Sequence, residues 1–180
     1  MDKHDIKLSR RLSYILRHKP EEFDVCLSAE GWTGTLAVAK ALKCTVEDIK
    51  RLVVTDDKGR YELRAHDTQV RAVQGHSSPQ VRISYPVMTP PDILYHGTST
   101  RNIDSILQNG INSASRNFVH LSEELVTAIA VGSRHGKPVV FAVDTKKVRA
   151  RGCDFYHAPN GVWLCPLTIP PDCISIYTQK

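Results

Sequence analysis

The sequence predicts an α+β protein of two lobes, and three features support that prediction. The first half has the pattern of three helices and a hairpin, whereas the second half alternates short strands with short helices. A segment rich in proline and turn-forming residues separates the halves at residues 85–91. With 180 residues and 41% hydrophobic content, the chain can bury one sizeable core or two small ones.

The N-terminal lobe is predicted to begin with an amphipathic helix at residues 6–16, which Pro20 prevents from continuing. Its apolar residues recur at three- and four-residue spacings, at Leu8, Leu12, Ile15 and Leu16. A second apolar stretch covers residues 36–42. A third helix is expected from the N-cap Thr45 to about Val54.

A β-hairpin is expected to complete this lobe. Residues 56–59 form a turn signal, residues 60–64 alternate as a strand does, and residues 70–73 supply its partner. Three helices and a β wing make a winged-helix-like module. Its usual association with nucleic acid is an argument from fold alone.

The second lobe is predicted to contain five strands and two helices. The strands are expected at residues 93–95, 118–121, 139–143, 162–164 and 174–177. The helices are expected at residues 100–108, ended by Gly110, and 123–134, ended by Gly136. The short connections favour a mixed or antiparallel sheet over a doubly wound one.

Charge and cysteine content narrow the class of protein. The net charge of +5 is spread over both halves, which suits a polyanionic partner without requiring one. The five cysteines lack the spacing of a zinc site, so we expect reduced thiols and no metal. No signal peptide or membrane span is visible, which predicts a cytoplasmic or nuclear protein.

Two short motifs carry candidate chemistry. Arg17 and His18 stand at the end of the first helix, where cations can simply compensate the helix dipole. In the segment YHGTS at residues 95–99, a strand is expected to end before a helix whose N-terminus suits an anion, and the glycine would allow close backbone approach. A tight turn with a capping hydroxyl is the alternative. The common nucleotide-binding loops are absent from the sequence.

Six segments, in order along the chain, resemble the NAD-dependent RNA 2′-phosphotransferases, the enzymes of the tRNA-splicing 2′-phosphate type. The segments are LRHKP (16–20), VRAVQGHS (70–77), PPDILYHGT (90–98), VHLS (119–122), RHGKPVV (134–140) and NGVWL (160–164). The resemblance implies a winged-helix-like, RNA-facing lobe at residues 1–87. It also implies an NAD-binding lobe of the ADP-ribosyltransferase fold at residues 88–180, with the active site in the cleft between the lobes.

The resemblance also implies a reaction. An internal RNA 2′-phosphate attacks the nicotinamide ribose carbon of NAD and releases nicotinamide. The ribose 2″-hydroxyl of the ADP-ribosylated RNA then attacks that phosphate, which leaves 2′-hydroxyl RNA and ADP-ribose 1″,2″-cyclic phosphate. NAD is thus a consumed co-substrate, and RNA such as spliced tRNA is the expected partner of a monomeric chain that binds no membrane.

The catalytic set of the family, three arginines and a histidine, falls on Arg17, His18, Arg60 and Arg116. Arginine offers a planar, permanently charged fork that suits a dianionic phosphate, so we expect the three arginines to clamp it. Histidine exchanges a proton near neutral pH, so His18 is expected to act as general acid or base in the second step.

His96 and His120 resemble the two histidines of the NAD-binding signature in this branch of the fold. Gly97 and Thr98 share the first motif, and Val162 falls at a third position where many relatives outside the branch carry glutamate. An anionic phosphate nucleophile needs no base in the first step, so the missing carboxylate fits a phosphate substrate.

Arg71 and His76 are candidate RNA or phosphate contacts. The alternatives are an ion pair for Arg71 and a structural turn position for His76.

Two other functions stay open. The chain could be an ADP-ribosyltransferase acting on terminal phosphates of nucleic acids, with little second-step activity. It could instead be a non-catalytic nucleic-acid-binding module. The intact arginine set argues against the second, because simple phosphate binding would tolerate lysine.

Overall fold

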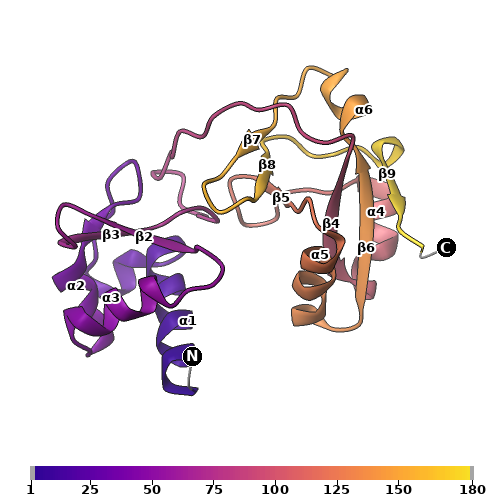
Figure 1. Ribbon diagram of the computed structural model, residues 1–180. Coiled ribbons are helices and arrows are strands. Elements are labelled where there is room, and N and C mark those ends of the chain that lie inside the picture. Colours follow the sequence, from indigo (N-terminus) through magenta and orange to yellow (C-terminus); the bar gives the residue numbers. More distant parts are fainter. Residues whose placement is uncertain (1–2, 179–180) are drawn as a thin grey trace. The chain divides into compact units, whose positions relative to one another are not determined.

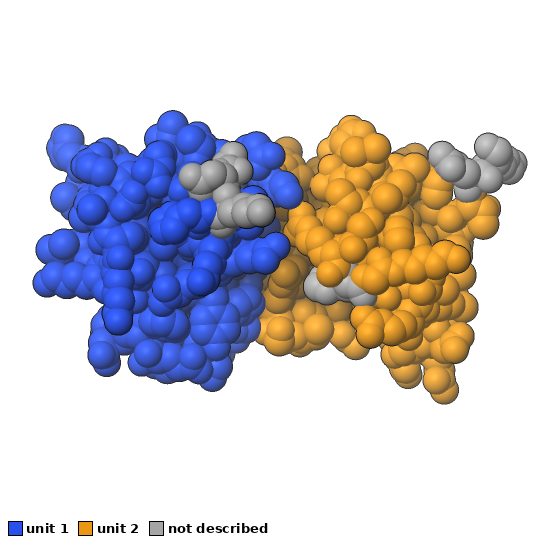
Figure 2. Space-filling model, turned by 90° about the horizontal axis from the view of Figure 1, so that it is seen from below, with its two compact units in different colours: residues 1–84 blue, residues 85–180 orange. Residues whose placement is uncertain are grey.

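Two separate hydrophobic cores divide the chain in the computed structural model, which describes residues 3–178. The division gives two compact units, residues 1–84 and residues 85–180, coloured separately in Figure 2. Each unit combines helices with antiparallel strands, so the protein is α+β (Figure 1).

Unit 1 contains the three expected helices. They are α1 (Lys3–Arg17), α2 (Thr35–Leu42) and α3 (Val46–Val54), with a 3₁₀ turn, η1 (Pro20–Phe23), after α1. The predicted cap of α3 is confirmed, because the Thr45 hydroxyl accepts from the Asp48 backbone N–H at 3.1 Å and the Asp48 carboxylate accepts from the Thr45 N–H at 3.0 Å.

A small antiparallel sheet joins the helices of unit 1. Its strands are β1 (Thr33–Gly34), β2 (Tyr61–Arg64) and β3 (Gln69–Ala72), in the order β1-β3-β2. The short strand β1 was not predicted. The buried hydroxyl of Tyr61 donates to the Ser9 carbonyl at 2.8 Å, so the start of β2 is fastened to α1.

Unit 2 contains two three-stranded antiparallel sheets. One has the order β4-β6-β9, from β4 (Ile93–Ser99), β6 (Pro138–Asp144) and β9 (Ile174–Ile176). The other has the order β5-β8-β7, from β5 (Val119–Leu121), β7 (Tyr156–His157) and β8 (Trp163–Cys165). The helices are α4 (Ile103–Asn109), α5 (Leu125–Gly132) and α6 (Thr145–Arg149), with 3₁₀ turns η2 (Thr100–Asn102), η3 (Ser133–His135) and η4 (Pro171–Cys173).

The strand expected at residues 93–95 is longer than predicted and ends only at Ser99, the last residue of the segment YHGTS, directly before the helical turn at residues 100–102. Strand β4 continues through Ser99 and pairs with β6 along its full length. Pairing with β6 extends the strand to Ser99, and α5 lies directly on β4 (Figure 1). A Cβ at Gly97 would lie 1.7 Å from the Ala128 carbonyl oxygen, so only glycine permits this approach.

Within residues 3–178, no helix has both the length and the apolar character needed to cross a membrane. The same residues contain no cluster of three or more metal-ligating His, Cys, Asp or Glu side chains. All five cysteines are free thiols, and Cys153 and Cys165 lie in the core with their sulfurs 3.3 Å apart.

Candidate functional site

The end of α1 is fastened to the segment that follows β3. The Ser77 backbone N–H donates to the Arg17 carbonyl at 2.9 Å, and the Ser77 hydroxyl lies 3.1 Å from His18 Nδ1. The His18 N–H donates to the Tyr14 carbonyl at 2.9 Å, so His18 continues the helical path of α1. Ser77 therefore orients the imidazole of His18 through one ring nitrogen.

The same segment packs against Arg17. Gly75 adopts a φ of +92°, which favours glycine, and a Cβ there would lie 3.5 Å from Arg17 Cδ and Nε. With this left-handed conformation, the Gly75 backbone packs closely against the Arg17 side chain. Arg17 and His18 are thus both positioned by residues 75–77.

His76 is buried behind Arg17, with only 4% of its surface exposed. Burial, together with the positive field of Arg17, Arg71 and His18, lowers the pKa of His76 to about 4. A Cβ at Gly31 would lie 3.1 Å from His76 Nε2, so the two residues pack closely. His76 is therefore a neutral residue at pH 7, within electrostatic reach of Arg17.

Arg60 is held by the buried carboxylate of Asp56, four residues earlier in the chain. Asp56 accepts hydrogen bonds from Arg60 Nε at 2.8 Å, from its Nη2 and from its backbone N–H. Burial is the largest single influence and opposes the charge of Arg60, but the hydrogen bond to Asp56 together with the negative charge of Tyr61, Asp56 and Asp57 outweighs it and raises the pKa of the guanidinium. Arg60 is thus a permanently charged and oriented fork.

Arg60 also lies at the segment that contacts Arg17. Its carbonyl accepts from the Val73 N–H at 2.9 Å, and Val73 is two residues from Gly75, at most about 7.6 Å along the backbone. Three of the four predicted catalytic residues therefore contact residues 73–77 of unit 1, Arg17 and His18 through their side chains and Arg60 through its backbone.

The fourth predicted catalytic residue, Arg116, lies in unit 2 near His96. Partial desolvation and then the positive charge of Arg134 lower the pKa of Arg116, and Arg116 contributes in turn to the lowered pKa of His96. Two cations and a histidine are therefore close enough to interact. Arg134 had not been predicted as a site residue.

His96 and His120 are joined through the backbone. His96 Nδ1 donates to the His120 carbonyl at 3.1 Å, and Tyr95 and Ser122 exchange two backbone hydrogen bonds of 2.8 Å. Burial lowers the pKa of His96, although its bond to the His120 carbonyl acts in the opposite direction. The two histidines thus belong to one locally ordered group.

Val162 directly precedes β8, whose residue Leu164 pairs with His120. Leu121 pairs with Trp163, and continuing that register by one residue places Val162 opposite Ser122.

Gly97 and Thr98 make packing contacts within unit 2. Gly97 admits α5, and the buried Thr98 hydroxyl accepts from Asn102 Nδ2 at 2.8 Å. Their role in NAD binding stays a prediction.

Arg71 is engaged within unit 1. Its guanidinium lies 4.5 Å from the centre of the Trp32 ring, donates to the Glu30 carbonyl at 3.0 Å and pairs with Glu62. Arg64 stacks on the same ring at 4.2 Å. These contacts match the ion-pair interpretation of Arg71, and its contact with RNA stays a prediction.

Sequence reasoning missed two positioning residues. Asp56 was assigned to a turn, although its spacing of four residues from Arg60 is one at which a carboxylate can pair with an arginine. Ser77 stood inside a recognised motif, but only the structure shows its bond to His18.

Comparison with known proteins identifies the family. Residues 3–167 match the family described as "RNA 2'-phosphotransferase, Tpt1 / KptA family". A protein of Pectobacterium carotovorum subsp. carotovorum (strain PC1), named "Probable RNA 2'-phosphotransferase", is 45% identical over 171 residues, which cover 91% of this chain and 90% of the relative. A protein of the same name from Escherichia coli O6:K15:H31 (strain 536 / UPEC) is 42% identical over 171 residues, 91% of each chain. The chain therefore belongs to the RNA 2′-phosphotransferase family.

Proposed function

We propose that this protein is a transferase that moves an internal RNA 2′-phosphate to NAD. A phosphate oxygen attacks the nicotinamide ribose carbon and displaces nicotinamide. The adjacent 2″-hydroxyl then attacks phosphorus, and the bond from phosphorus to the RNA 2′-oxygen breaks. The products are 2′-hydroxyl RNA and ADP-ribose 1″,2″-cyclic phosphate, and spliced tRNA is a natural substrate for such chemistry inside the cell.

The observation that carries this proposal is the convergence of Arg17, His18 and Arg60 on residues 73–77. Two arginines can hold the phosphate through bidentate, charge-assisted hydrogen bonds. Asp56 and Gly75 fix the arginines in advance, which lowers the entropy lost when phosphate binds. We assign Arg116 to the same phosphate chemistry, as the resemblance implies.

His18 is assigned the proton transfer of the second step. That step removes a proton from the 2″-hydroxyl and delivers one to the departing 2′-oxygen. A single imidazole that accepts the first proton and donates the second satisfies both requirements. Ser77 holds the ring for this role through Nδ1.

Unit 2 is assigned the binding of NAD. The chemistry of its side chains fits the dinucleotide, because the ring nitrogens of His96 and His120 suit ribose hydroxyls. Val162 adds an apolar contact and no carboxylate. We propose on this basis a winged-helix-like lobe at residues 1–87 and an ADP-ribosyltransferase-like lobe at residues 88–180.

One assay tests the proposal. The protein is incubated with NAD and an RNA carrying one internal 2′-phosphate, and nicotinamide and RNA are followed by mass spectrometry. We expect nicotinamide release, loss of the phosphate and formation of the cyclic product. Stable ADP-ribosylated RNA or the absence of nicotinamide would overturn the proposal. The variant His18→Ala should accumulate ADP-ribosylated RNA, because only its second step needs proton transfer.

A further inference from the structure

One face of α1 carries a row of exposed polar side chains that leads to the half-buried His18 directly after the helix. His4, Lys7, Arg11, Tyr14 and His18 follow one another at three- and four-residue spacings, which places them on one side of the helix. The bond from the His18 N–H to the Tyr14 carbonyl keeps His18 in this row. We call these five residues the α1 row.

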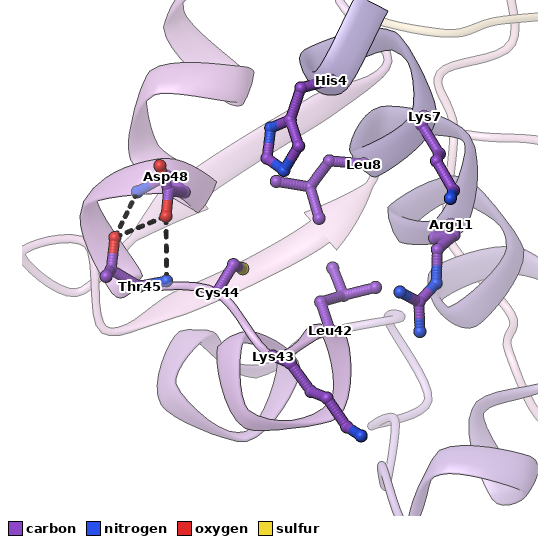
Figure 3. Close-up of a pocket in the computed structure, with 9 residues that line it drawn as sticks. All are labelled: His4, Lys7, Leu8, Arg11, Leu42, Lys43, Cys44, Thr45 and Asp48. Carbon is purple, nitrogen blue, oxygen red and sulfur yellow. Dashed lines mark hydrogen bonds between the residues drawn. The ribbon is translucent and has the colours of Figure 1, made fainter.

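The N-terminal half of the α1 row borders a cavity of about 410 Å³. In Figure 3, His4, Lys7 and Arg11 rise from one helix, Leu8 and Leu42 lie between them and the facing segment, and Lys43 extends from that segment. The cavity is therefore lined by cations around a partly apolar floor.

The charge around this cavity is predominantly positive. Lys7, Arg11 and Lys43 carry basic side chains, and none of them belongs to an ion pair found among residues 3–178. The one carboxylate of the lining, Asp48, is already used by Thr45 and by Arg51 at 2.9 Å. The hydrogen bonds from Thr45 lower the pKa of Asp48, so it stays ionised but compensated.

Tyr14 lies between the cations and His18. Its side chain is 41% exposed, and its ring centre lies 6.3 Å from that of His18. Its hydroxyl donates to Glu22 at 3.1 Å, and Glu22 in turn faces Lys19, which compensates the nearby carboxylate. Cations interleaved with an exposed aromatic ring are typical of surfaces that follow single-stranded nucleic acid.

The length of the α1 row matches a stretch of several nucleotides. From residue 4 to residue 18 the helix rises about 21 Å, at 1.5 Å per residue. A stacked strand carries one phosphate per roughly 3.4 Å of its axis, so about six phosphates span this distance. Lys7 and Arg11 thus lie within reach of an RNA strand whose 2′-phosphate is at His18.

We propose that the RNA strand flanking the reacting 2′-phosphate runs along the α1 row, from His18 over Tyr14 to Arg11, Lys7 and the adjoining cavity. This inference rests on the proposed function, because it takes His18 as the phosphate site. Contacts of this kind are made to the RNA backbone and carry no base sequence. Such contacts make long RNA substrates bind more tightly than short ones, and this difference in affinity decreases as the salt concentration rises.

The test compares two substrates of one chemistry. One is an RNA of three nucleotides with a central 2′-phosphate, and the other carries about ten nucleotides on each side of it. The double variant Lys7→Gln/Arg11→Gln should raise the KM of the long RNA by roughly three- to tenfold and leave kcat unchanged. Its KM for the short RNA should equal that of the wild type.

Salt dependence gives a second readout. Each phosphate contact on single-stranded nucleic acid contributes about 0.7 to the slope of log affinity against log salt concentration. The double variant should therefore lower this slope by about 1.4 for the long RNA and by nothing for the short one. The control Lys40→Gln/Arg149→Gln removes the same two charges from exposed positions outside the row and should behave as the wild type.

The outcomes separate this inference from the function beneath it. If the wild type is active and the double variant raises the KM of both substrates equally, or of neither, the RNA does not follow α1. A control variant that matches the double variant would also overturn the inference, because overall charge would then explain the effect. A wild type that is inactive on both the short and the long RNA with NAD would refute the proposed function itself, and this inference with it.

Discussion

The substitution Asp56→Asn isolates the role of a residue that touches no substrate in our account. The Asp56 side chain is fully buried, and it accepts three hydrogen bonds from Arg60, two of them from the guanidinium. Asparagine keeps the size of the side chain but removes its charge and replaces one acceptor with a donor. The Arg60 fork should therefore lose its fixed orientation while the fold is kept.

The structure allows the size of the effect to be worked out. A hydrogen bond to a charged group contributes about 1.5–3 kcal/mol, and the amide oxygen of asparagine retains one of the two guanidinium bonds in weakened form. The Arg60 side chain is 28% exposed, so water replaces part of the loss. We expect the free energy of unfolding of unit 1 to fall by about 2 kcal/mol. Misplacement of Arg60 should lower kcat/KM for 2′-phosphorylated RNA by about 10²-fold.

Calorimetry measures the stability, and single-turnover loss of the RNA 2′-phosphate measures the activity. The neighbouring Asp57 is exposed in the same turn, so Asp57→Asn is the matched control and should leave both quantities unchanged. If Asp56→Asn has the activity of Asp57→Asn, Arg60 does not depend on Asp56 and the reasoning is refuted.

Three further predictions follow from single contacts. Ser77→Ala should lower the rate of the second step about tenfold and leave the rate of nicotinamide release unchanged, because only the orientation of His18 is lost. An equal fall in the two rates would contradict this. Gly97→Ala should lower the melting temperature of unit 2 by more than about 10 °C, because a Cβ there overlaps the backbone of α5, whereas Gly34→Ala has room and should not. The free energy of unfolding should fall by about 3 kcal/mol between pH 6.5 and pH 4 because of His76, since the imidazole is protonated in the unfolded state at a higher pH than in the folded state. Denaturant midpoints measured over this pH range should show the fall in the wild type, and His76→Gln should lack the contribution of His76.

Local signals were sufficient for most helices. The spacing of apolar residues predicted α1, and Thr45 predicted the start of α3, because caps and periodicity depend on neighbouring residues. The course of Tyr95 to Ser99 was missed because it depends on pairing with β6, some forty residues later in the chain. No sequence rule reports such a distant partner.

In the candidate site, too, some residues were predicted from the sequence and the contacts that position them were not. Arg17, His18 and Arg60 were predicted through the resemblance, because residue type and motif predict a phosphate site there, and that role stays a prediction. The burial of Asp56 and the contact of Gly75 with Arg17 depend on how the hairpin folds back onto α1. Such positioning contacts are tertiary, so a single sequence does not contain them in readable form.

The central claim is that the RNA phosphate itself is transferred to NAD. The most direct measurement uses RNA with a ³²P label in its internal 2′-phosphate, incubated with NAD and the protein and separated by chromatography. Our account predicts that the label leaves the RNA and appears in an ADP-ribose cyclic phosphate, with one nicotinamide released per labelled phosphate. Label that stays in the RNA, or is released as inorganic phosphate, would contradict it.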